Sequence, residues 1–251
     1  MPHFARYPSL QSRHVLITGG ATGIGATLVE QFIAQGARVG FIDIDGAAGE
    51  ALAARLPGAF FVRADLTDIE ALRAAIASLR DQLGGPFQVL LNNAANDRRI
   101  PVEDVTSESW DAGLAVNLKH QFFAAQAVLP DMRAAGGGSI INFGSISWML
   151  KQGGMQAYTA SKAAIQGLTR TLARDLGAHG IRVNTLVPGW VMTDKQLKLW
   201  VGDAEREEIA KGQCINKPLL AEHIAHMALF LAADDSAMCT AQDFIVDGGW
   251  A

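Results

Sequence analysis

Residues 14–36 have the sequence HVLITGGATGIGATLVEQFIAQG, in which an apolar run, a glycine-rich turn and an amphipathic segment follow one another. Residues 14–18 are predicted to form a buried strand. Leu28, Phe32 and Ile33 then recur at helical spacing, and Gly36 follows as the stop signal. Glycines let the backbone approach a pyrophosphate closely, and the free N–H groups at the start of a helix attract its charge. This stretch therefore predicts a dinucleotide-binding turn.

Apolar runs and amphipathic segments alternate along the rest of the chain. Further strands are predicted at 38–42, 60–64, 88–91, 139–143, 182–186 and 243–246, and helices at 69–79, 110–132, 157–177 and 221–232. This alternation indicates an α/β fold of Rossmann type, with a doubly wound parallel sheet and helices on both faces. The charged stretch 194–217 interrupts the pattern and is interpreted as a small helical flap. Because no linker or repeat divides the sequence, we expect residues 1–251 to form a single domain.

Composition narrows the functional classes. The chain has 251 residues, 49% of them apolar, and a formal net charge of −4, so it lacks the basic surface of a nucleic-acid-binding protein. Cys214 and Cys239 have neither metal-ligand nor disulfide spacing. No segment resembles a signal peptide, and none reaches the roughly 18 apolar residues that span a bilayer. We therefore expect a cytoplasmic protein with no bound metal, no nucleic-acid partner and no membrane contact.

Asp43 follows the second predicted strand, where a carboxylate accepts hydrogen bonds from the ribose hydroxyls of a dinucleotide. It would repel a 2′-phosphate, and no Arg or Lys occurs within Gly19–Gly25 to compensate. These features favour NAD, with NADP as the alternative. The competing interpretation is that Asp43 merely caps the next helix.

Tyr158 and Lys162 lie four residues apart at the start of a predicted helix, so their side chains share a face at about 5–6 Å. A neighbouring ammonium favours the phenolate, and we expect it to lower the pKa of Tyr158 towards neutrality. Tyr158 is therefore a candidate general base. Ser145 ends an apolar run, and its hydroxyl could donate to a substrate oxygen. A Tyr–Lys pair at this spacing is also common without any catalytic role.

Two polar features stand out at predicted structural positions. Residues 96–99, Asn-Asp-Arg-Arg, follow the fourth strand and form either a solvated loop or a polar substrate wall. Asn117 lies inside a predicted helix, although Asn is a poor helix former. A buried amide needs hydrogen-bond partners, so Asn117 either bonds the backbone or organises water.

Four motifs resemble the short-chain dehydrogenase/reductase family from Thr18 to Gly248. Thr18, Gly19, Gly23 and Gly25 match its TGxxxGxG turn, and residues 92–95 resemble its NNAG motif with Ala95 in place of Gly. Asn117, Ser145, Tyr158 and Lys162 match its catalytic tetrad, and residues 188–193 match its PGxVxT segment. The resemblance implies that the cofactor-binding residues are Gly19, Thr22, Gly23, Ile24, Gly25, Asp43, Asp65, Leu66, Asn93, Ala94, Tyr158, Lys162, Pro188, Gly189, Val191 and Thr193.

The same resemblance implies a role for each member of the tetrad. Tyr158 would act as general acid/base, and Lys162 would lower its pKa and hydrogen-bond the nicotinamide ribose. Ser145 would orient the reacting oxygen, while Asn117 would hold a water molecule in a proton relay. A homotetramer is also implied, built partly through the helices at 110–132 and 157–177.

Within the family the sequence is similar to bacterial aldose 1-dehydrogenases, in NNAANDRR, VNLKHQFF, INFGSISW and AKGQC. That likeness implies oxidation of the C1 hemiacetal hydroxyl of a cyclic aldose, such as L-arabinose, D-xylose, D-galactose or L-fucose, to the aldonolactone. Residues 149–155 depart from those enzymes. The predicted substrate residues are Asn96, Asp97, Ser145, Trp148, Tyr158 and Trp190. The alternatives are a dehydrogenase of another secondary alcohol or polyol, or a cofactor-binding sensor without activity.

Overall fold

The computed structural model describes residues 4–251, in which seven parallel strands form one sheet of order β3-β2-β1-β4-β5-β6-β7. The predicted α/β fold is confirmed. Each predicted strand occurs within one or two residues of its expected ends. The strands are β1 (His14–Thr18), β2 (Arg38–Asp43), β3 (Ala59–Arg63), β4 (Val89–Asn92), β5 (Gly138–Phe143), β6 (Ile181–Pro188) and β7 (Asp243–Val246).

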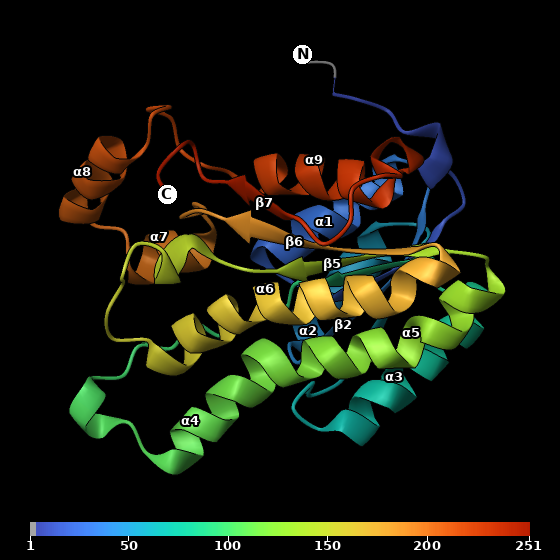
Figure 1. Ribbon diagram of the computed structural model, residues 1–251, viewed down its shortest axis with the longest axis horizontal. Helices are drawn as coiled ribbons and strands as arrows, with labels where there is room; N and C mark the ends of the chain where they lie inside the picture. The colour runs from blue at the N-terminus through green and yellow to red at the C-terminus, as the bar shows by residue number, and fades with distance from the viewer. Residues whose placement is uncertain (1–3) are drawn as a thin grey trace.

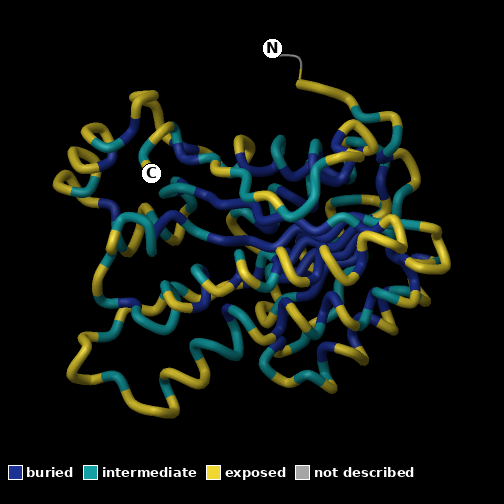
Figure 2. Tube along the Cα trace, in the orientation of Figure 1, coloured by how far each residue is buried: buried dark blue, intermediate teal, exposed yellow. Residues whose placement is uncertain are grey.

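Helices cover both faces of the sheet, as Figure 1 shows for α1 and α9 on one face and α3, α5 and α6 on the other. Successive residues of one strand therefore enter different cores: Val15 joins the α1 and α9 side, and Leu16 the opposite side. The strands are accordingly continuous apolar runs, and they form the buried centre in Figure 2. The principal helices are α1 (Gly23–Ala34), α2 (Gly46–Arg55), α3 (Ile69–Leu83), α4 (Ser107–Leu114), α5 (His120–Ala134), α6 (Gln156–Leu176) and α9 (Ala221–Ala232).

The strand order reverses at β1, which pairs with β2 on one side and with β4 on the other. Thr18 is in register with Ile42 and with Asn92, so Gly19, Asp43 and Asn93 emerge side by side at the carboxyl edge. Ligands of open α/β sheets bind in the crevice at such a switch point.

The helix predicted at 110–132 has different ends and is interrupted. It begins at Ser107 because Thr106 and Ser109 form a reciprocal capping box, each side chain bonding the main-chain N–H of the other. Between α4 and α5, residues Ala115–Lys119 form a π-helical turn. Asn117 lies in this turn, a local distortion that often occurs at functional sites.

The stretch predicted as a flap, 194–217, contains two short helices, α7 (Asp194–Leu199) and α8 (Asp203–Gly212). A parallel bridge between Val191 and Leu219 closes the base of this excursion. In Figure 1 the arrowheads of β5, β6 and β7 point towards α7, α8 and the C-terminus, so all three lie at the carboxyl edge. Across residues 4–251, no helix has the length and apolar character needed to cross a membrane.

Candidate active site

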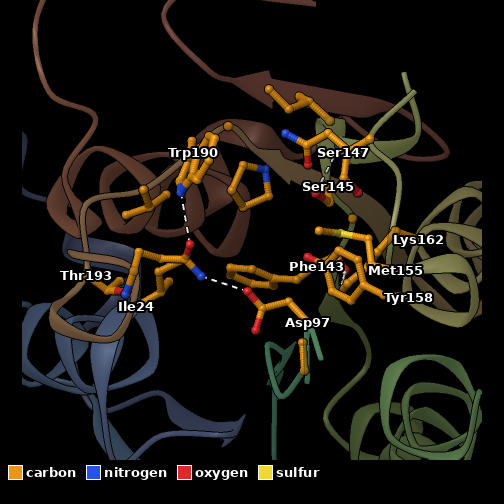
Figure 3. A pocket seen from close by; sticks show the side chains of 18 of the residues that line it. Ile24, Asp97, Phe143, Ser145, Ser147, Met155, Tyr158, Lys162, Trp190 and Thr193 are labelled. Carbon is orange, nitrogen blue, oxygen red and sulfur yellow. Dashed lines mark hydrogen bonds between the residues drawn. The ribbon is translucent and has the colours of Figure 1, made fainter. Parts of the chain in front are cut away.

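A cavity of about 170 Å³ opens at the carboxyl edge of the sheet. Residues far apart in the sequence line it, contributed by α1, by the segments after β4, β5, β6 and β7, and by α6 and α7 (Figure 3). The predicted site residues that it brings together are Ile24, Asn93, Asp97, Ser145, Tyr158, Lys162, Pro188, Gly189, Trp190, Val191 and Thr193. It therefore joins most of the expected cofactor and catalytic residues in one place.

The glycine-rich turn between β1 and α1 is held tightly. Gly19 has a φ of 67°, and a Cβ added to Gly25 would lie 1.8 Å from the Gly19 carbonyl oxygen, so no side chain fits there. The Asn93 amide donates to the carbonyl oxygens of Thr18 and Gly19, at 3.1 and 2.8 Å. The Thr22 side chain caps no N–H group of α1 within the described residues. The open first turn of α1 thus fits a pyrophosphate.

Asp43 supports this turn from the neighbouring strand. Its Oδ2 accepts from the Ala21 N–H at 2.9 Å, and its Oδ1 accepts from the Asp45 N–H at 3.0 Å. Helix α2 is capped by Asp45, which accepts from the Ala48 N–H at 3.0 Å. The alternative that Asp43 caps the next helix is therefore wrong.

Other expected cofactor residues lie beside the cavity lining. Ala94 is buried, and its N–H donates to the Thr18 hydroxyl at 3.2 Å. A Cβ on Gly23 would approach the Thr193 methyl group at 3.4 Å, which places the turn next to the segment after β6. Asp65 is exposed and bonds Thr67, while Leu66 is buried; neither lines the cavity.

Lys162 and Tyr158 occupy the first two turns of α6. Lys162 is 1% exposed, donates to the main-chain oxygen of Phe143 at 2.7 Å, and has its Nζ 5.5 Å from the Tyr158 ring centroid. Burial lowers the pKa of Lys162 to about 7. Burial also raises the pKa of Tyr158 to about 12, although a hydrogen bond with Ser145 acts in the opposite direction.

The prediction that Lys162 lowers the pKa of Tyr158 towards neutrality is therefore wrong for the protein without bound cofactor or substrate. Two physical reasons account for this. Desolvation of the Tyr158 phenolate outweighs the attraction of a nearby cation, and burial lowers the pKa of Lys162 to about 7, so that the ammonium is only partly charged at neutral pH. In addition, Lys162 directs its proton to Phe143.

Asn117 uses its side chain to hold the backbone. Its Oδ1 accepts from the Asn96 N–H at 2.8 Å, and its Nδ2 donates to the carbonyl oxygens of Asn96 and Gly113 at 3.0 and 2.9 Å. Of the two alternatives for this buried amide, bonding to backbone is confirmed, and both amide protons are already committed. Asn117 and Asn96 line a smaller adjacent cavity of about 110 Å³ that also reaches Tyr158.

Asp97 ties the 96–99 loop to α7. Its carboxylate accepts from Lys195 Nζ at 2.5 Å and from Gln196 Nε2 at 2.7 Å. Although desolvation acts to raise it, these two hydrogen bonds hold the pKa of Asp97 below its ordinary value. Gln196 Oε1 in turn accepts from Trp190 Nε1 at 2.9 Å, and Figure 3 shows this chain of bonds along one side of the cavity.

Two predicted substrate residues lie outside the main cavity. Asn96 faces the smaller cavity, and Trp148 lines neither, its buried Nε1 having no partner in residues 4–251. Arg99, from the stretch interpreted as either a solvated loop or a polar substrate wall, does line the cavity. The cavity also includes residues that were not predicted, namely Ala95, Phe143, Gly144, Ile146, Ser147, Gln152, Met155, Gln196 and Trp250. The sequence did contain a signal for Trp250, because this residue follows the last predicted strand, β7, and the carboxyl ends of parallel strands meet at the ligand-binding edge.

A dinucleotide turn at the switch point of the sheet, with a tyrosine and a lysine at the same edge, defines a nicotinamide-dependent oxidoreductase. Residues 19–251 match a family model described as enoyl-(acyl carrier protein) reductase. The chain belongs to the short-chain dehydrogenase/reductase family, whose dehydrogenases use NAD or NADP. The family resemblance noted from the sequence is thus confirmed.

Similar proteins match over nearly the whole chain. It is 46% identical to "Probable galactose dehydrogenase GalD" of Rhizobium meliloti (strain 1021), over 98% of this chain and 97% of that protein. It is 44% identical to D-xylose 1-dehydrogenase of Caulobacter vibrioides (strain NA1000 / CB15N), over 98% of each. A crystal structure from Sinorhizobium meliloti 1021, described as that of "a putative short-chain alcohol dehydrogenase", superposes with a TM-score of 0.91 at 29% identity, covering 97% of this chain and 98% of that one.

Proposed function

We propose that this protein oxidises the C1 hemiacetal hydroxyl of a cyclic aldose to the aldonolactone, with hydride transfer to NAD. The observation that carries the proposal is a single cavity in which Ser145 and Tyr158 share space with the polar loop residues Asp97 and Arg99. A hydroxyl-rich ligand requires several placed polar groups of this kind. Relatives 46% and 44% identical are named for galactose and D-xylose, which supports an aldose.

Each residue of the site has a role in this reaction. The turn from Gly19 to Gly25 holds the pyrophosphate, and Asp43 binds the adenosine ribose; bound NAD supplies the hydride acceptor. Ser145 donates to the C1 oxygen and orients it, while Tyr158 removes its proton. Lys162 hydrogen-bonds the nicotinamide ribose. Since the Asn117 amide is committed to backbone, its role is to position the 96–99 loop.

We also propose NAD in preference to NADP, because the Asp43 carboxylate repels a 2′-phosphate. The flap at 194–217 covers the substrate side, joined to the 96–99 loop through Asp97. The proposed assembly is a cytoplasmic homotetramer. Two large apolar side chains on α4 and α5 are exposed, Trp110 at 37% and Phe122 at 38%, which supports their burial between subunits.

A polyol is the second candidate substrate. A relative 36% identical is named galactitol 2-dehydrogenase, and another, 35% identical, is named D-threitol dehydrogenase. Both are less similar than the relatives named for aldoses.

The proposal is tested with a panel of aldoses (D-xylose, L-arabinose, D-galactose, L-fucose and D-glucose) and of polyols, each with NAD and NADP, by absorbance of the reduced cofactor. We expect the highest kcat/KM on an aldose with NAD. Turnover of polyols without turnover of any aldose would identify the second candidate, a polyol, as the substrate.

The proton acceptor is tested by Tyr158→Phe, which keeps the ring and removes the hydroxyl. We expect kcat to fall at least about 100-fold, the lower range for loss of a general base, with NAD binding retained. Turnover near that of the wild type would exclude Tyr158 as the base.

A further inference from the structure

Trp250 follows β7 and lines the same cavity as Ser145 and Tyr158. Its ring centroid lies 6.4 Å from that of Trp190, and the two rings are 16° from parallel. Both side chains are half-buried and both line the cavity, so each presents part of its aromatic ring system to it. We call these two residues the tryptophan wall.

The main chain at Trp250 is fixed by a buried carboxylate. Asp247 is 5% exposed; its Oδ1 accepts from the Gly249 N–H at 2.8 Å, and its Oδ2 accepts from the N–H groups of Trp250 and Ala251 at 3.1 and 2.8 Å. Gly249 has a φ of 82°, a left-handed conformation that favours glycine. One side chain thus holds this segment in a turn directed at the cavity.

Helix α8 and the residues after it fix the indole from the other side. A Cβ added to Gly212 would lie 2.2 Å from Trp250 Nε1, so glycine at this position leaves the room that the ring occupies. The Cys214 thiol donates to the Gly249 carbonyl oxygen at 3.2 Å, and the Ile215 N–H donates to the Gly248 carbonyl oxygen at 2.9 Å. The flap therefore carries one support of the tryptophan wall.

The second tryptophan is oriented independently. Trp190 donates its Nε1–H to Gln196, and the Arg99 guanidinium lies 5.9 Å from its ring centroid. Figure 3 places Trp190 across the cavity from Tyr158, with Asp97 between the two sides. A flat apolar surface on one side and a proton acceptor on the other match a ring that carries its reactive hydroxyl at one edge.

We propose that Trp250 is a specificity-determining residue, which together with Trp190 stacks against the C–H face of the pyranose ring while the C1 hydroxyl faces Tyr158. This inference rests on the proposed aldose oxidation. Ring carbons of a pyranose present an apolar face to an aromatic ring, while the hydroxyls at its rim are left to polar groups such as Asp97 and Gln152. An open-chain polyol has no such rigid face.

The test uses two substitutions that disturb the wall by different routes. Trp250→Ala removes the ring, and Gly212→Ala retains it but places a methyl group where the indole lies. Trp250→Phe keeps an aromatic face. Gly177→Ala is the matched control for Gly212→Ala, because Gly177 has helical backbone angles and a Cβ there would meet nothing within 4 Å.

We expect Trp250→Ala and Gly212→Ala each to raise the aldose KM about tenfold, with kcat reduced less than about threefold and the KM for NAD within about twofold of the wild type. Trp250→Phe should recover most of the affinity, and Gly177→Ala should match the wild type. If Trp250→Ala does not fold, Gly212→Ala and Trp250→Phe decide the question.

Two results would overturn the role of the tryptophan wall. One is an aldose KM within twofold of the wild type in folded Trp250→Ala or Gly212→Ala. The other is a rise in the KM for NAD equal to the rise in the aldose KM in these two variants. Failure of the proposed function looks different, since the wild type itself would then oxidise no aldose, and the inference would fall with it.

Discussion

At the residue scale, we expect the protonation of Tyr158 to set the pH dependence of the proposed reaction. The proposed oxidation requires the Tyr158 phenolate, and burial raises the pKa of Tyr158 to about 12. Below that value the phenolate fraction grows about tenfold for each pH unit. We therefore expect kcat/KM for aldose oxidation to rise with this slope from pH 7 to pH 10, measured at saturating NAD. A plateau that begins near pH 7 would show that the pKa in the working complex is far lower than in the protein alone.

Asp43 and Asp45 provide a matched pair for cofactor choice. Asp43 supports the glycine-rich turn, whereas Asp45 caps α2 two residues later. Asp43→Ala should narrow the ratio of kcat/KM for NAD to that for NADP, because it removes the repulsion of a 2′-phosphate. Asp45→Ala should leave this ratio unchanged and cost about 1 kcal/mol of stability through loss of the cap. An unchanged ratio in Asp43→Ala would refute the ribose assignment.

The motif residues were predictable individually, but their environments were not. Spacing alone predicted that Tyr158 and Lys162 share one helical face, because positions i and i+4 are neighbours on the surface of any α-helix. Their pKa directions depend on burial by other elements, and local spacing carries no information about that. Trp250 was missed for a similar reason. Its position depends on a local turn held by Asp247 and on Gly212 in a helix 38 residues earlier in the chain. Trp148 was predicted instead because it is closer in sequence to Ser145 and Tyr158.

At the element scale, the π-helical turn depends on one amide. Asn117→Asp keeps the acceptor but presents a carboxylate to the carbonyl oxygens of Asn96 and Gly113. We expect the free energy of unfolding to fall by about 3 kcal/mol, since two part-buried carbonyl oxygens lose their donor and a charge is placed at a buried side chain. Urea denaturation measures the difference.

Gln126→Glu is the control for that substitution, because it makes the same amide-to-carboxylate change on the exposed side of α5. Gln126 Oε1 accepts from Arg73 at 3.0 Å, a bond that a carboxylate also accepts. Its stability should stay within about 0.5 kcal/mol of the wild type. Equal stabilities for the two variants would mean that the Asn117 donors contribute nothing to the turn.

Strand positions followed from the sequence because both faces of the sheet are covered, which makes each strand a short apolar run bounded by turn residues. β7 has the predicted ends, 243–246. The helix at 110–132 was less predictable. Its periodicity indicated a helix, but the interrupted turn contains Asn117, whose side chain bonds the main chain of Asn96, 21 residues earlier, and local periodicity carries no information about that contact.

At the scale of the whole molecule, cofactor binding should be visible as a gain in stability. The dinucleotide site joins the turn before α1 to the segments after β4 and β6, so a bound cofactor links both halves of the sheet. A ligand at 100 times its Kd stabilises the native state by about 2.7 kcal/mol, or a rise in Tm of about 5–10 °C for a chain of this size. We expect NAD to raise Tm more than NADP at equal concentration, measured by differential scanning fluorimetry. Equal shifts would contradict the proposed preference.

The reversal of strand order at β1 also has a genetic consequence. The residues proposed to select the adenosine moiety, the glycine-rich turn and Asp43, are encoded before Gly84, the left-handed residue that ends α3, whereas Asp97, Trp190, Gln196 and Trp250 are all encoded after it. Recombination between related genes at this residue would exchange the coenzyme preference of an enzyme in one step and leave its choice of sugar intact. The two specificities could thus be inherited, and diversify, as separate gene segments.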